Sequence, residues 1–159
     1  MSILLYRVDE RLIHGQVTVG WGARLRPDRF VVVDREVAES DWEQELYLLG
    51  VPEGVDAEFV APEAARTRLA EWKTSPSRII LLTRDVATMV EVGREGGLAG
   101  ETVNLGGIHF QAGREEVLPY IFLDQDLKDL LETLEASGAE VSAQDLPDSS
   151  EVPLRDLVD

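Results

Sequence analysis

Four residues whose side chains can do chemistry lie close together near the start of the chain. Asp9, Glu10, Arg11 and His14 fall within six consecutive positions, and Gly15 follows them. A neutral imidazole offers a ring-nitrogen lone pair near pH 7, because the reference pKa of histidine is about 6.5. Such a nitrogen can attack phosphorus and is regenerated when the next acceptor takes the group. The stretch therefore indicates phosphoryl transfer through His14.

The neighbours of His14 suit this chemistry. Arg11 offers a planar guanidinium for phosphoryl oxygens. Asp9 either holds the second ring nitrogen of His14 or orients Arg11. Gly15 and Gln16 open a helix whose first N–H groups and positive dipole end favour an anion, so both are predicted to contact the phosphoryl group. The competing interpretation is that His14 only packs or caps the helix.

Two opposing influences are expected on the pKa of His14. The carboxylates of Asp9 and Glu10 raise this pKa, whereas Arg11 and the start of the helix lower it. A site that later holds a dianionic phosphoryl group should be arranged as an anion receptor. We therefore expect the positive pair to win and the pKa of His14 to be lowered.

Short apolar strands and amphipathic helices alternate around this stretch. The predicted strands cover residues 3–8, 30–33, 57–60, 79–82, 102–105, 120–123 and 141–144, the last as an edge strand. The predicted helices cover residues 16–25, 40–49, 62–72, 86–95 and 127–137. The alternation predicts an α/β fold of three layers, in which a mainly parallel sheet has helices on both faces.

Ligands of such folds bind at the carboxyl ends of the strands, which makes the loops the next candidates. These loops cover residues 9–15, 34–39, 83–85 and 106–113. Arg84 either meets the phosphoryl group or a partner, or it pairs with a carboxylate such as Asp85. His109 is predicted to be an exposed loop residue, with a phosphoryl contact or a gate as the alternative.

A pair of glycines, Gly106 and Gly107, follows the strand predicted at 102–105. They are interpreted as turn residues that need positive φ. Asn104 is expected to end the strand and fix that turn, with a direct ligand role as the alternative. The acidic pair at 115–116 is interpreted as part of a solvated face.

Composition narrows the classes of function. The chain has 159 residues, of which 44% are hydrophobic, so we expect one domain over 1–159 with an irregular tail after about residue 147. A net charge of −16 argues against nucleic acid as a partner. The chain has two histidines and no cysteine, so the sequence gives little support for a metal site, and we predict neither a metal nor a cofactor. No segment approaches the roughly 20 apolar residues that span a bilayer, so a cytoplasmic location is expected.

Residues 8–17, Val-Asp-Glu-Arg-Leu-Ile-His-Gly-Gln-Val, closely resemble the signature of the IIB component of the mannose/fructose/sorbose family of the bacterial sugar phosphotransferase system. The likeness continues in Val31–Asp34, in the Asn-Leu-Gly-Gly segment of Val103–Phe110 and in residues 130–147, and so covers nearly the whole chain. The resemblance implies a parallel α/β sheet with an antiparallel edge strand.

The resemblance also implies a role in a relay. The δ nitrogen of His14 receives a phosphoryl group from a phosphohistidine on a IIA partner, and Arg11 assists. The group then passes to a sugar that enters through the integral membrane IIC and IID components, at the inner face of the membrane. This is the activity of a protein-Nπ-phosphohistidine–sugar phosphotransferase, and it needs no metal or nucleotide because the histidine-bound group is already activated.

Other interpretations stay open on the sequence alone. The same phosphocarrier can serve a regulatory relay without sugar transport. A plain binding module would use the loop for a free anion and would not be phosphorylated on His14. A metal hydrolase built from His14, His109 and Asp9 is a further possibility. Neither the sugar nor the oligomeric state follows from the sequence, and self-association is left open.

Overall fold

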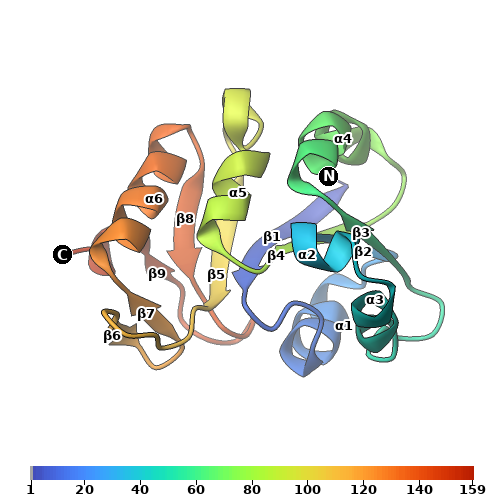
Figure 1. The fold of residues 1–159 in the computed structure, drawn as a ribbon, viewed down its shortest axis with the longest axis horizontal. Coiled ribbons are helices and arrows are strands. Elements are labelled where there is room, and N and C mark those ends of the chain that lie inside the picture. Colours follow the sequence, from blue (N-terminus) through green and yellow to red (C-terminus); the bar gives the residue numbers. More distant parts are fainter. Residues whose placement is uncertain (1) are drawn as a thin grey trace.

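The computed structural model describes residues 2–159 and alternates strands with helices (Figure 1). Its strands are β1 (Ile3–Asp9), β2 (Arg29–Val33), β3 (Asp56–Val60), β4 (Ile79–Thr83), β5 (Thr102–Gly107), β6 (Glu115–Leu118), β7 (Ile121–Leu123), β8 (Glu140–Ala143) and β9 (Val152–Pro153). Its α-helices are α1 (Gly22–Leu25), α2 (Arg35–Ala38), α3 (Asp41–Leu48), α4 (Pro62–Thr74), α5 (Val86–Val92) and α6 (Gln125–Ala136). A π-helix, η1 (Gln16–Trp21), and two 3-10 helices, η2 (Arg94–Gly96) and η3 (Leu154–Asp156), complete the elements.

Seven strands form the main sheet in the order β3-β2-β4-β1-β5-β8-β9. All neighbouring pairs are parallel except β8 with β9, which is antiparallel. The predicted α/β fold, with a mainly parallel sheet and an antiparallel edge strand, is therefore confirmed. Because β1 is a central strand, the loop that follows it opens between the carboxyl ends of β4 and β5.

Apolar side chains pack against both faces of the sheet, because successive residues of a strand point to opposite sides. On β2, Val31 and Val33 face the cluster that includes residues of α4, α5 and α6, whereas Phe30 and Val32 face the cluster that includes η1. Val17 anchors η1 in that second cluster and is fully buried. This packing fixes where the loop between β1 and η1 can run.

The end of the chain differs from the prediction. The strand predicted at 141–144 is β8, which lies inside the sheet and not at its edge. The edge strand is β9, formed by the tail that was expected to be irregular, and η3 follows it. β9 has only two residues, one of them Pro153, so no alternating pattern in the sequence could predict it. It is a strand only because it pairs with β8.

Several other elements depart from the sequence pattern. The strand predicted at 120–123 is β7, which pairs with the unpredicted β6 in a separate sheet beside α6 (Figure 1). The loop predicted at 34–39 contains the short helix α2, capped by the Asp34 side chain. The helix predicted at 86–95 ends as α5 at Val92, and Glu95 adopts a left-handed φ of 60°. The helix predicted at 16–25 begins as a π-helix.

Candidate functional site

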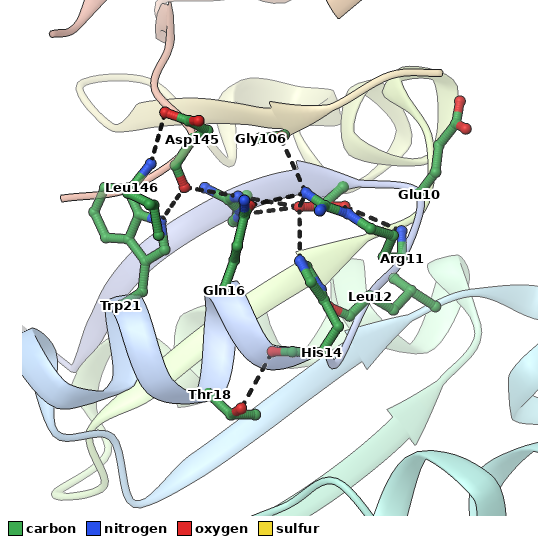
Figure 2. A network of polar contacts seen from close by, with 12 residues as sticks. Glu10, Arg11, Leu12, His14, Gln16, Thr18, Trp21, Gly106, Asp145 and Leu146 are labelled. Carbon is green, nitrogen blue, oxygen red and sulfur yellow. Dashed lines mark hydrogen bonds and ion pairs between the residues drawn. The ribbon is translucent and has the colours of Figure 1, made fainter. Parts of the chain in front are cut away.

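The loop between β1 and η1 is a tight turn held by Asp9. The Leu12 N–H donates to the Asp9 carbonyl (2.9 Å), and the Arg11 N–H donates to Asp9 Oδ1 (3.0 Å). Leu12 has a φ of 55°, a left-handed conformation that costs a non-glycine residue about 1 kcal/mol or more. Its side chain is fully buried in the core, which holds this conformation in place. The turn presents His14 at the carboxyl edge of the sheet (Figure 2).

Asp9 binds two arginines at once. Its carboxylate accepts from Arg11 Nε (2.9 Å) and Nη2 (2.9 Å), and from Arg7 Nη2 (3.0 Å). Burial alone would raise the pKa of Asp9, but the Arg11 hydrogen bonds and the Arg7 charge lower it below its usual range. Asp9 therefore stays ionised and orients Arg11, which is one of the two roles that the sequence allowed.

The His14 ring lies between Asp9 and the carbonyl of Leu12. Nδ1 is 2.8 Å from the Leu12 oxygen, and since a carbonyl only accepts, the neutral ring carries its proton on Nδ1. Nε2 is buried, 3.6 Å from Asp9 Oδ2, and has no hydrogen-bond partner among residues 2–159. The side chain is 18% exposed. In this orientation neither nitrogen is presented to an incoming group.

The pKa of His14 is lowered, as predicted, but for a different reason. Burial lowers it most, the Leu12 carbonyl and Asp9 raise it, and Arg11 and Arg7 lower it further. Glu10 is not aimed at the ring. Its carboxylate lies 3.2 Å from His109 Nδ1 and 3.2 Å from Arg114 Nη1. The prediction from the sequence compared only the charges near His14, because the burial of the ring cannot be read from the sequence.

Arg11 is fixed from several sides. Besides Asp9, its Nη2 donates to Gln16 Oε1 (3.0 Å) and to the Gly106 carbonyl (3.3 Å). Gln16, which the sequence predicted to contact a phosphoryl group, contacts Arg11 in this structure. A Cβ added to Gly15 would meet no atom within 4 Å, so the space beside His14 is open.

Arg7 is the member of the site that the sequence argument missed. It is fully buried on β1 and donates to Asn104 Oδ1 (2.6 Å) and to the carbonyls of Gln144 (3.1 Å) and Asp145 (3.1 Å). Its guanidinium also lies 5.5 Å from the centroid of the Trp21 ring. The available signal was a charged residue two positions before Asp9 in an apolar strand, where both side chains share one face.

The interpretation of the two glycines as turn residues is wrong. Gly106 and Gly107 are the last residues of β5, and neither has a positive φ. A Cβ on Gly106 would lie 2.0 Å from Arg7 Cζ, and one on Gly107 would lie 2.8 Å from Asp9 Oδ1. Glycine is required because buried charged side chains cross this strand.

Asn104 likewise lies within β5 and does not fix a turn. It is buried, accepts from Arg7 and donates to the Gln144 carbonyl (3.0 Å). The expected strand end at Leu105 is therefore two residues too early, since β5 runs to Gly107. Asn104 helps to hold Arg7 in the site.

Arg84 and His109 stand apart from His14. Arg84 Nε pairs with Asp34 Oδ1 (3.2 Å), and no contact recorded within residues 2–159 joins it to His14. The prediction that His109 is exposed in a loop is confirmed, because it is 51% exposed and contacts Glu10. Within 2–159 no three histidine or carboxylate side chains gather as metal ligands, and no helix is long and apolar enough to cross a bilayer.

Comparison with known proteins gives a family match over residues 3–159, to the sorbose subfamily IIB component of the phosphotransferase system. The chain is 35% identical over 149 residues to the N-acetylgalactosamine-specific phosphotransferase enzyme IIB component 1 of Escherichia coli K12, covering 92% of each. It is 31% identical over 158 residues to the mannose-specific EIIAB component of the same strain, covering 99% of this chain and 49% of that protein.

Solved structures of IIB components also resemble this chain. The IIB component 1 of the Escherichia coli N-acetylgalactosamine system superposes with a TM-score of 0.86 at 31% identity, covering 94% of this chain and 97% of that one. The IIB domain of the sorbose permease from Klebsiella pneumoniae superposes with a TM-score of 0.88 at 23% identity, covering 99% and 96%. At that lower identity the second likeness concerns the fold alone.

Proposed function

The chain belongs to the sorbose-subfamily IIB components of the phosphotransferase system, and from this premise we propose that His14 is the residue that carries the phosphoryl group. A phosphohistidine on a IIA partner donates the group, and a sugar receives it during transport through IIC and IID membrane components. The observation that carries the proposal is the cluster of Asp9, Arg11 and His14 at the carboxyl end of a central parallel strand.

The transfer itself needs positioning and charge. A lone pair of the His14 ring forms the new N–P bond, the N–P bond of the donor breaks, and its electron pair returns to the donor imidazole. Arg11 donates two side-chain hydrogen bonds to Asp9 and one to Gln16, which leaves its Nη1 outside these contacts. A guanidinium fixed in this way stabilises charge on the transferring oxygens without reorganising.

Attack by the δ nitrogen, as in the proposed relay, requires the ring to move. In the unphosphorylated protein Nδ1 carries the proton and its N–H donates a hydrogen bond to the Leu12 carbonyl. The proton must therefore pass to Nε2, and the ring must turn Nδ1 away from that carbonyl. Before this movement Nε2 lies 3.6 Å from Oδ2 of the ionised Asp9, a carboxylate that can accept a hydrogen bond from a protonated Nε2.

The remaining predicted contacts are part of the same proposal. Gly15 leaves room for the phosphoryl group beside His14, and Gln16 keeps Arg11 in place. Arg84 reaches the group or a partner after leaving Asp34, to which it is now paired. We treat residues 1–159 as one phosphocarrier domain that works on the cytoplasmic side, at the inner face of the membrane through its transporter partners.

The test is phosphorylation by the upstream relay proteins and phosphoenolpyruvate, followed by mass measurement and peptide mapping. We expect one acid-labile, base-stable phosphoryl group, located on His14. The His14→Gln variant should fold and accept nothing, while the matched His109→Gln variant should be labelled like the parent. Label on His109 would overturn the assignment, and binding of free phosphate without covalent label would favour the plain anion module.

A further inference from the structure

An exposed aromatic ring stands close to the site and has no part in the transfer chemistry. Phe110 follows β5 in the loop that leads to β6, and it is 65% exposed. Single exposed apolar side chains are common, but aromatic residues are enriched among those that dominate protein–protein binding. The question is which partner this ring contacts.

The loop that carries Phe110 is held in place from several sides. The ring packs edge-to-face on Phe122, with centroids 5.9 Å apart and planes at 81°. Arg114 Nη1 donates to the His109 carbonyl (2.7 Å) and pairs with Glu10 (3.2 Å). A ring presented by a fixed loop loses little conformational entropy on binding, which favours affinity.

The loop that carries Phe110 begins at the end of β5, which contacts Glu10 and Arg11. The Glu10 N–H donates to the Gly107 carbonyl (3.0 Å), and Glu10 directly precedes Arg11. A Cβ on Gly107 would lie 3.1 Å from Arg11 Nη2, so the end of β5 and Arg11 are in close contact. Phe110 comes three residues later in the chain. His109, which directly precedes Phe110, has its Nδ1 3.2 Å from the Glu10 carboxylate, so the loop that carries the ring contacts the residue next to Arg11.

We propose that Phe110 is the apolar anchor for the phosphohistidine-bearing protein that charges His14. In this arrangement an apolar pocket beside the donor's phosphohistidine takes the ring, while the dianionic phosphoryl group faces Arg11. The inference rests on the proposed function. It names the donor because His14 is only 18% exposed, so the donor's surface around its own histidine must press on the rim of the site to bring phosphorus to nitrogen.

Charge complementarity supports this choice of partner, and the chain also offers a control for the test. Arg11 is 34% exposed and is the cation nearest to His14 at the rim, which complements a dianion on an otherwise acidic chain. The chain offers a control in Trp42, which lies on α3 and is also 65% exposed. If general apolar exposure governed binding, the two aromatics would behave alike.

The experiment compares a protein donor with a small one. Initial rates of His14 phosphorylation are measured against the concentration of phosphorylated IIA protein and, separately, of phosphoramidate. Phe110→Ala should raise KM for the protein donor roughly tenfold or more, leave kcat within about twofold and leave the phosphoramidate rate unchanged. Phe110→Tyr should recover most of the affinity, and Trp42→Ala should behave like the parent.

Each other outcome is decisive. An unchanged KM in Phe110→Ala overturns the proposal, as does a larger effect of Trp42→Ala, which would place the donor on α3. Unchanged acceptance combined with slower delivery to sugar in membrane vesicles would assign Phe110 to the transporter instead and also overturn it. If the parent accepts phosphate from neither donor, the proposed function itself is wrong, and that result is distinguishable from a failure of Phe110 alone.

Discussion

Two aspartates occupy equivalent places at the carboxyl ends of two parallel strands of the main sheet. Asp9 is the last residue of β1 and Asp34 directly follows β2, and β4 lies between the two strands. Each accepts a backbone N–H two or three residues later and also binds an arginine, Arg11 or Arg84. Yet Asp34 caps a short helix, whereas Asp9 lies beside His14 and binds a second arginine.

The difference lies in the residue two positions before each aspartate. In β1 this residue is Arg7, which is fully buried and brings a second guanidinium to Asp9. In β2 the corresponding residue is Val32, which packs in the core. One buried charge thus turns a strand-end aspartate into the centre of a polar cluster. The comparison suggests variants that exchange the features of the two places.

The largest effect is expected for Arg7→Val, which gives β1 the residue type that β2 has at the corresponding position, Val32. It leaves Asp9 and Asn104 buried with a lost partner, and breaking such a buried pair costs about 3–5 kcal/mol. Urea unfolding should show this loss, together with failure of phosphoryl acceptance. The control is Arg84→Val, which removes the partly exposed partner of Asp34 and should cost about 1 kcal/mol or less. Equal losses in both variants would show that the two aspartates do not differ as described.

The next effect is expected for Gly106→Ala. Its methyl group would enter the space of the Arg7 guanidinium, so Arg7 must move away from Asp9. Overpacking of this kind costs about 1–3 kcal/mol, and transfer should slow because Arg11 loses its fixed carboxylate. Gly15→Ala is the control, since its methyl group meets open space in a helical backbone and should change stability by about 0.5 kcal/mol at most. An unchanged melting temperature in Gly106→Ala would contradict the crowding argument.

A smaller effect, confined to catalysis, is expected for Arg11→Lys. Lysine keeps the charge but cannot reproduce the two-point contact with Asp9 and the additional bond to Gln16. Transfer should lose on the order of 2 kcal/mol of transition-state stabilisation, with little change in unfolding free energy. The measurement is the single-turnover rate of His14 phosphorylation. A rate within about twofold of the parent would show that Arg11 does not act on the phosphoryl group.

The smallest effect concerns pH. Burial lowers the pKa of His14 below its ordinary value of 6.5, so the folded protein keeps the ring neutral at pH 7. Acceptance should stay near its plateau at pH 7 and decline only below roughly pH 6. The unfolded chain binds the proton more readily, so the stability that His14 contributes is lost as pH falls below the ordinary value. Initial rates and NMR titration of His14 test this, and a midpoint above about pH 7.5 would refute it.

Local sequence features were enough to predict the loop and its surroundings. Asp9 ends an apolar strand, Arg11 and His14 lie between it and an apolar-faced helix, and both elements form at nearly the expected residues. Short-range patterns also predicted the alternation of strands and helices. These features are readable because they depend on neighbours a few positions away in the chain.

Features that depend on distant pairing were not predictable in the same way. The need for glycine at Gly106 follows from Arg7, which crosses from the adjacent strand β1. The role of Asn104 requires knowing that β5 lies between β1 and β8. β9 exists only through its partner strand, and the depth at which His14 is buried emerges only when the loop packs on the sheet.

The hydrogen bonds of Arg7 also bear on when the protein becomes competent. The Gln144 and Asp145 carbonyls that hold this arginine come 137 and 138 residues after it. In a growing chain the loop after β1 is therefore made long before the carbonyls of Gln144 and Asp145 that support it. Contacts between residues so far apart in the chain form slowly, because closing the long loop between them costs conformational entropy before the contacts can stabilise the fold. During refolding, recovery of phosphoryl acceptance should lag behind recovery of helical circular dichroism, so that an incompletely folded chain is kept out of the relay.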